Sequence, residues 1–114
     1  MRKVALLKRW FEVASTRDID DEEAVQVEVN GELVALFNLG GKFYATSDHC
    51  PAAANASLSA GYIEDGLVYC EDDRYCYEIR TGLPRHDPDD PPVRRYPVKI
   101  DNGLVYVGVV IEAG

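Results

Sequence analysis

The chain has 114 residues, of which 46% are hydrophobic and 28% charged, and its formal net charge is −8. This length and composition fit one globular domain, residues 1–114, and exclude a disordered chain. The acidic balance excludes nucleic acid as a partner, and it favours a protein partner whose basic patch meets an acidic surface.

The hydrophobic stretches are all too short for a membrane. The longest, residues 104–111, is interrupted by a glycine, which predicts a protein with no membrane partner. Near the N-terminus the apolar residues 4–7 end at Lys8, too short a run for a signal peptide, and we therefore expect a cytoplasmic protein. Three cysteines in such a chain favour metal or redox chemistry, or a buried thiol, over a disulfide framework.

The first predicted elements are a short helical turn and a hairpin. The turn is expected within residues 15–21, capped by Asp18 or Asp20. The dipeptide Asn30-Gly31 then separates two β-rich runs, residues 24–29 and 32–37. Asn-Gly favours a type I′ turn, which needs positive φ at both central residues, so this segment predicts a β-hairpin.

The rest of the chain repeats this alternation of short β-rich runs and turn dipeptides. The dipeptides are Gly40-Gly41, Asp65-Gly66, Thr81-Gly82 and Asn102-Gly103. The expected strands cover residues 42–46, 61–63, 67–70, 75–79, 97–100 and 104–109. This pattern predicts an all-β fold, an antiparallel β-sandwich or barrel.

Two loops carry the candidate chemistry. The first, residues 47–61, contains Cys50 and closes on the sequence Leu-Ser-Ala-Gly at positions 58–61. The second, residues 70–82, begins at Cys70 and closes on Thr81-Gly82. The chain shows no Ser/His/Asp arrangement, phosphate-binding glycine loop or paired catalytic carboxylates, and we therefore do not expect an enzyme.

These two loops resemble those of Rieske-type ferredoxins of aromatic-ring dioxygenase systems, and the resemblance extends over residues 10–110. That family has a Cys-x-His loop with a Leu-Ser-x-Gly turn, and then a Cys-x-x-His loop with a Thr-Gly turn. The resemblance implies a Rieske-type fold with a small cluster-binding subdomain. It also implies a [2Fe–2S] cluster with two thiolates on one iron and two imidazoles on the other, and a role as electron carrier.

The two cluster histidines of the family are missing from this chain. Cys50 and Cys70 match the family's cysteines, whereas Ala52 and Asp73 stand at the histidine positions. The first loop is one residue longer than usual, and alanines at residues 52–54 leave no alignment that restores a histidine. In this the chain also resembles the small subunit of NAD(P)H-dependent nitrite reductase, which keeps the fold without a cluster.

Three interpretations of the site follow. A standard cluster would need nitrogen from His49 and His86, but His49 is adjacent to Cys50 and its side chain should point to the opposite face. A mononuclear metal could use Cys50 and Cys70 with Asp73, or more weakly with either histidine. The interpretation we favour is a site with no cofactor, in which the two thiols stay reduced or form a disulfide.

Two functions correspond to these interpretations. One is an accessory or interaction component of an oxidoreductase, with a degenerate cluster site and an acidic docking surface for an oxygenase or reductase component. The other is an electron-transfer ferredoxin of an aromatic-ring dioxygenase, holding [2Fe–2S] or a mononuclear metal through unconventional ligands.

Overall fold

Ten β-strands and one short helix make up the computed structural model, which describes residues 5–53, 55–71 and 74–113. The elements in chain order are β1 (Ala5–Ser15), η1 (Thr16–Asp18), β2 (Glu23–Val29), β3 (Glu32–Leu39), β4 (Lys42–Ser47), β5 (Tyr62–Glu64), β6 (Leu67–Tyr69), β7 (Cys76–Glu78), β8 (Arg95–Tyr96), β9 (Val98–Asp101) and β10 (Leu104–Ala113). Among the described residues, η1 is the sole helix, and three residues are far too few to cross a membrane.

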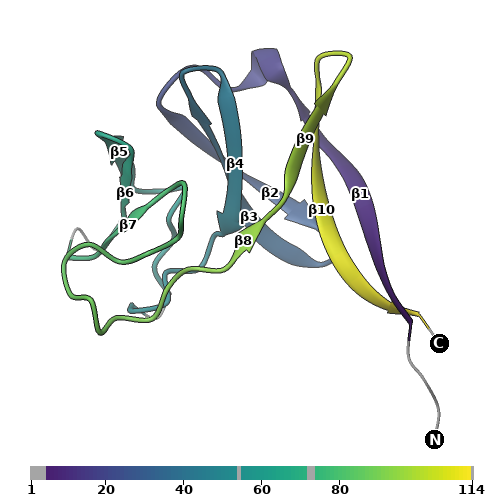
Figure 1. Ribbon diagram of the computed structural model, residues 1–114. Coiled ribbons are helices and arrows are strands. Elements are labelled where there is room, and N and C mark those ends of the chain that lie inside the picture. The colour runs from purple at the N-terminus through teal and green to yellow at the C-terminus, as the bar shows by residue number, and fades with distance from the viewer. Residues whose placement is uncertain (1–4, 54, 72–73, 114) are drawn as a thin grey trace, which may run out of the picture.

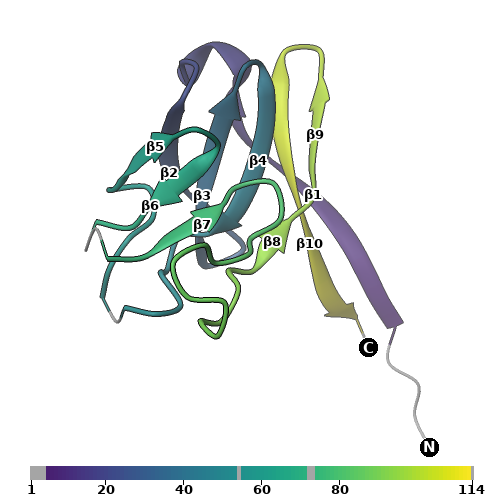
Figure 2. The same cartoon turned by 60° about the vertical axis from the view of Figure 1, so that its left-hand side comes forward.

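The strands form three antiparallel sheets. Their strand orders are β1-β10-β9, β2-β3-β4-β8 and β5-β6-β7. In Figures 1 and 2 the four-stranded sheet lies between the other two, with the small β5-β6-β7 sheet projecting on one side. The predicted all-β architecture with a small subdomain is therefore confirmed.

The middle sheet is buried on both faces at β3. Val34 and Leu36 pack into the cluster shared with the β1-β10-β9 sheet, whereas Ala35 and Phe37 pack into the cluster shared with the small sheet. All four side chains are fully buried. Because alternate residues of a strand face opposite ways, this short hydrophobic run supplies two cores at once.

The predicted hairpin turns are confirmed. Asn30 and Gly31 have φ angles of 52° and 82°, as a type I′ turn between β2 and β3 requires. The same pair of positive angles recurs at Gly40-Gly41, Asp65-Gly66 and Asn102-Gly103. These dipeptides lie between β3 and β4, β5 and β6, and β9 and β10.

Two features of the N-terminal region differ from the sequence-based expectation. Residues 5–15 form a long strand that was not predicted, and η1 is capped by Ser15 instead of Asp18 or Asp20. The Ser15 hydroxyl accepts from the Arg17 amide, and the Ser15 amide donates to the Asp18 carboxylate at 2.9 Å. Asp18 therefore completes a capping box from inside the turn.

Phe37 offers a test of the double burial of β3. We expect Phe37→Ala to lower the free energy of unfolding by about 3–5 kcal/mol, because it removes a fully buried ring between two layers. Urea denaturation measures the change. Ile100→Ala is the matched control, since Ile100 is 47% exposed, and a loss there as large as at Phe37 would contradict the layered core.

Candidate functional site

The two cysteine loops lie side by side and are joined by a direct link. The Ser57 amide donates to the Glu71 carboxylate at 2.7 Å, and the Glu71 amide donates to the Ser57 carbonyl at 3.3 Å. Ser57 belongs to the loop that follows β4, and Glu71 directly follows Cys70. The link therefore fixes the first loop against the start of the second.

A buried carboxylate holds the first loop together. Asp48 is 3% exposed and accepts from the Ser57 hydroxyl at 2.9 Å, the Ser59 amide at 2.7 Å and the Ser59 hydroxyl at 3.0 Å. The side-chain amide of Gln26, on β2, donates to the same carboxylate. These four donors satisfy the buried charge, and they tie the loop to the middle sheet.

Gly61 allows the same loop to approach the second one closely. A methyl group built at this position would lie 1.6 Å from the Tyr69 carbonyl oxygen. No side chain fits there, so the glycine of the Leu-Ser-Ala-Gly turn is required by its contact with the backbone just before Cys70.

Cys50 and Cys70 are buried in one apolar cluster. Their side chains are 0% and 1% exposed, and the cluster also contains Leu58, Val68 and Tyr77. The Cys50 sulfur lies 3.8 Å from the Tyr77 hydroxyl. Burial, with a smaller contribution from the hydrogen bond to Cys50, raises the pKa of Tyr77, so the phenol stays protonated beside the thiol. Both cysteines are present as thiols.

Alanines complete the lining of this cluster. Ala53 and Ala56 are buried within it, and Ala52 packs against it. The Ala52 position therefore contributes a methyl group to an apolar contact.

Both histidines are exposed, whereas Cys50 and Cys70 are buried. His49 is exposed, and it borders shallow surface hollows beside Leu33. His86 is exposed and meets the ring of Tyr69 edge-on, with 6.4 Å between ring centroids. Cys70 directly follows β6, which ends at Tyr69, and its side chain is buried.

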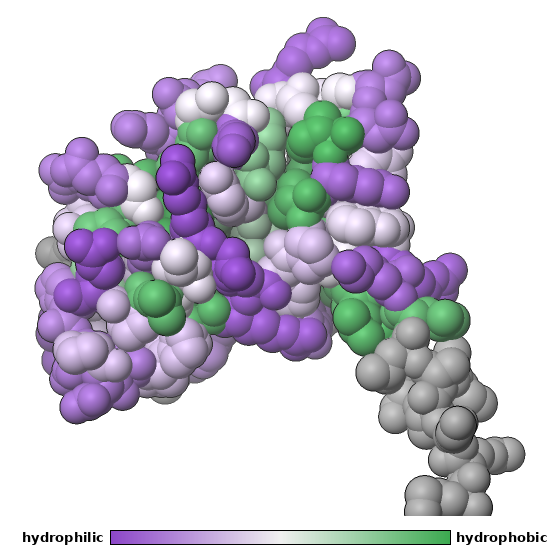
Figure 3. Space-filling model, viewed as in Figure 1, coloured by the Kyte–Doolittle hydropathy of each residue, from purple (hydrophilic) through white to green (hydrophobic). Residues whose placement is uncertain are grey.

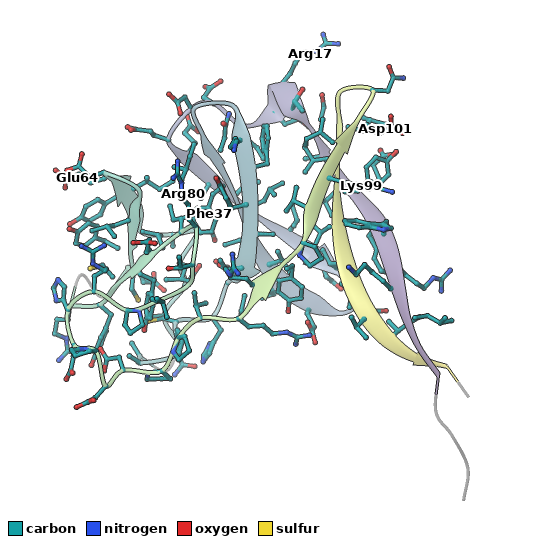
Figure 4. The ribbon with its side chains drawn as sticks, viewed as in Figure 1. Arg17, Phe37, Glu64, Arg80, Lys99 and Asp101 are labelled. Carbon is teal, nitrogen blue, oxygen red and sulfur yellow. The ribbon has the colours of Figure 1, made fainter. Side chains whose placement is uncertain are left out.

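One surface hollow has no cysteine in its lining. It is a groove of about 680 Å³ lined by acidic residues at Asp21, Glu22, Asp65 and Glu78, with Arg80 and Arg85 among them. In Figure 4 the labelled Arg80 lies between the small sheet and the middle sheet that carries Phe37. Hydrophilic residues also cover much of this side of the molecule in Figure 3.

Comparison with known proteins identifies this arrangement. Residues 9–108 match the family model described as the Rieske-like [2Fe-2S] domain. The chain belongs to this family. The resemblance inferred from the two cysteine loops is thus confirmed.

The curated relatives of this Rieske-like chain are ferredoxin subunits. It is 34% identical over 105 residues to the anthranilate 1,2-dioxygenase ferredoxin subunit of Burkholderia cepacia, covering 92% of this chain and 96% of the relative. It is 35% identical over 91 residues to the 3-phenylpropionate/cinnamic acid dioxygenase ferredoxin subunit of Escherichia coli K12, covering 79% of this chain and 84% of the relative. Since such subunits are carriers, the expectation that the chain is not itself an enzyme is confirmed.

Solved structures support the same family and fold. The ferredoxin of carbazole 1,9a-dioxygenase from Nocardioides aromaticivorans matches with a TM-score of 0.80 at 27% identity, covering 86% of this chain and 95% of that one. A nitrite reductase small subunit from Mycobacterium tuberculosis matches with a TM-score of 0.83 at 23% identity, covering 92% of this chain and 98% of that one. The second match shows that the two share a fold.

The residues described here do not fit the donor set of a standard Rieske cluster. That cluster takes two thiolates and two imidazoles. Cys50 and Cys70 are buried in one cluster, whereas His49 and His86 are exposed, and the Ala52 side chain offers no donor atom. Within the described ranges, no three His, Cys, Asp or Glu side chains are grouped to hold a metal ion. Asp73 lies outside those ranges.

Asp48 is a residue that the sequence did not single out among the 20 acidic ones. We expect Asp48→Ala to lower the free energy of unfolding by about 2–4 kcal/mol, because it removes a buried carboxylate and leaves the donors of Ser57, Ser59 and Gln26 without their acceptor. Urea denaturation measures the change.

Asp87→Ala is the matched control for this prediction. Asp87 accepts one backbone hydrogen bond, from the Asp89 amide, on an exposed loop, and we expect its removal to cost less than about 1 kcal/mol. Equal losses in the two variants would contradict the role assigned to Asp48.

Proposed function

We propose that this chain is a Rieske ferredoxin-like component of an aromatic-ring oxygenase system whose cluster site is degenerate, and that it acts as an accessory or interaction component without a redox role. The observation that carries this proposal is that Cys50 and Cys70 are buried while His49 and His86 are exposed, and that no three His, Cys, Asp or Glu side chains of the described ranges are grouped. Without nitrogen ligands, the second iron of a standard cluster has nothing to hold it.

The packing around the thiols supports the absence of a cofactor. Cys50, Cys70 and Tyr77 share their cluster with Ala53 and Ala56, all of them buried. Apart from the two thiols and the Tyr77 hydroxyl, the described residues of this cluster are apolar, so they supply a metal with few ligands and few of the outer hydrogen bonds that orient ligands.

A protein partner is the second part of the proposal. Ferredoxin and oxygenase form a complex in carbazole 1,9a-dioxygenase, to whose structure this chain is 29% identical. In this chain the net charge of −8 and the acidic groove at Asp21, Glu22 and Asp65 favour docking to a basic patch. Complementary charge of this kind chiefly raises the association rate. We place the protein in the cytoplasm, where thiols remain reduced.

A second function is favoured by the retained cysteine pair. Cys50 and Cys70 lie in the same buried cluster on adjacent loops, as two thiolates on one iron would require. Under this alternative the chain carries electrons to an aromatic-ring dioxygenase through [2Fe–2S] or a mononuclear metal. Asp73 is the proposed oxygen ligand, and His49 and His86 are weaker candidates.

Iron and acid-labile sulfide, measured per chain on protein purified anaerobically, distinguish the two functions. A folded protein without iron, sulfide or visible colour supports the degenerate site. About two irons and two sulfides per chain would overturn it in favour of the carrier, and one tightly held metal ion without sulfide would favour the mononuclear site.

Restoring the missing ligands tests whether only the ligands have been lost. We expect the triple change Ala52→His, Asp73→His with Ala54 deleted to take up about two irons per chain on anaerobic reconstitution, with a visible Rieske spectrum, because the family loop is then rebuilt. The unaltered chain under the same conditions should remain colourless.

Cys50→Ser in the restored background is the control, and it should abolish the colour because it removes one thiolate. Circular dichroism establishes that each variant is folded. A folded triple variant that takes up no iron would contradict the idea that the scaffold is otherwise ready for a cluster.

A further inference from the structure

One edge of the β1-β10-β9 sheet has no hydrogen-bonded neighbour among the described residues. β1 is the edge strand, and at 11 residues it is the longest strand in the structure. In Figures 1 and 2 its N-terminal half and the C-terminal half of β10 extend beyond the other sheets as an arm. A long open edge of this kind is a template for pairing with another strand.

The hydrogen bonds of β10 show which backbone groups of β1 are on this open edge. The Gly108 amide donates to the Pro97 carbonyl at 2.9 Å, so the backbone of Gly108 is turned toward β9. Its partner across the sheet is Trp10. In an antiparallel pair the hydrogen-bonded positions alternate, so Lys8, Trp10 and Glu12 direct their N–H and C=O groups away from β10.

The side chains of these residues form the outer face of the sheet. Trp10 lies across Gly108, where an added methyl group would come within 3.1 Å of the indole. The Lys99 ammonium lies 4.7 Å from the centre of the indole, and the Lys8 ammonium 5.7 Å. Lys8 and Glu12 are exposed on either side of Trp10.

We propose that two copies of this chain associate by antiparallel pairing of β1 with β1, with the two-fold axis at Trp10. This register places Lys8 opposite the partner's Glu12, and Glu12 opposite the partner's Lys8. The backbone groups of Lys8, Trp10 and Glu12 then bond to those of the second copy, and the dimer gains two cross-strand ion pairs.

Neighbouring registers lack this complementarity. An axis at Arg9 sets two arginines directly opposite each other, which is destabilising. An axis at Phe11 places Glu12 opposite the partner's Trp10. It also places Lys8 opposite the irregular stretch of the partner's β1 between Glu12 and Ala14, where the register with β10 shifts. The order of charges along β1 therefore selects the axis at Trp10.

Apolar surface on the arm supports a second copy as the occupant. Leu7 is 50% exposed and Val110 is 53% exposed. Figure 3 shows hydrophobic residues gathered toward the lower end of the arm. A second arm alongside the first removes part of this surface from water, which favours association. The arm also carries Lys8 and Arg9, so the negative charge of the rest of the chain is locally offset.

Charge exchange at Lys8 and Glu12 tests both the dimer and its register. Sedimentation equilibrium over a concentration series measures the dissociation constant of the full chain and of three variants, Lys8→Glu, Glu12→Lys and the double exchange. We expect each single variant to weaken the dimer at least tenfold, or about 1.4 kcal/mol, because two attractive pairs become repulsive. The double exchange should return the constant to within about threefold of the original, because the pairs are restored with reversed sign.

Lys42→Glu is the matched control, since it makes the same change of charge at an exposed residue of β4. Trp10 is the single tryptophan of the chain, so its emission should shift with protein concentration in the original chain and in the double exchange. A chain that stays monomeric up to about 1 mM would overturn the proposal, because a dissociation constant above that value means a binding free energy weaker than about −4 kcal/mol. An effect of Lys8→Glu no larger than that of Lys42→Glu, or a double exchange without recovery, would also overturn it.

Discussion

Burial of β3 on both faces is the constraint on which the rest of the structure depends. Val34 and Leu36 belong to one core, and Ala35 and Phe37 to the other. Since both cores use the same four-residue run, neither outer sheet can shift against the middle one without disturbing it. The cysteine loops are held on one side of this layer, and the β1–β10 arm is held on the other.

The loop scaffold is separate from the residues that would hold a cluster. Asp48, Ser57, Gly61 and Glu71 fix the two loops, and none of them occupies a ligand position of the family. A change of ligand therefore leaves the supporting contacts in place. This separation explains how a chain with alanine at residue 52 keeps a Rieske-type arrangement, with Cys50 and Cys70 in one cluster.

The sequence predicts local structure well where a short motif permits only one backbone conformation. Asn30-Gly31 and Asn102-Gly103 specify their turns because both residues must adopt positive φ. It did not predict β1, because the alternation of apolar and polar residues fails at Arg9, where the strand leaves the core. Asp48 was also missed, because its donors are Ser57 and Ser59, which lie later in the same loop, and Gln26 on β2. Whether a carboxylate has such partners depends on tertiary contacts that no local pattern contains.

The three strands of the small sheet are only three residues long each, whereas β1, β3 and β10 have 11, 8 and 10 residues. Short strands at one side of a molecule are the kind of unit that opens by local unfolding while longer ones stay closed. Amide hydrogens of β5, β6 and β7 should then exchange with solvent ahead of those in β3. The thiols of Cys50 and Cys70 would become reachable through the same opening, so the rate at which reagents find them is set by the small sheet's own stability.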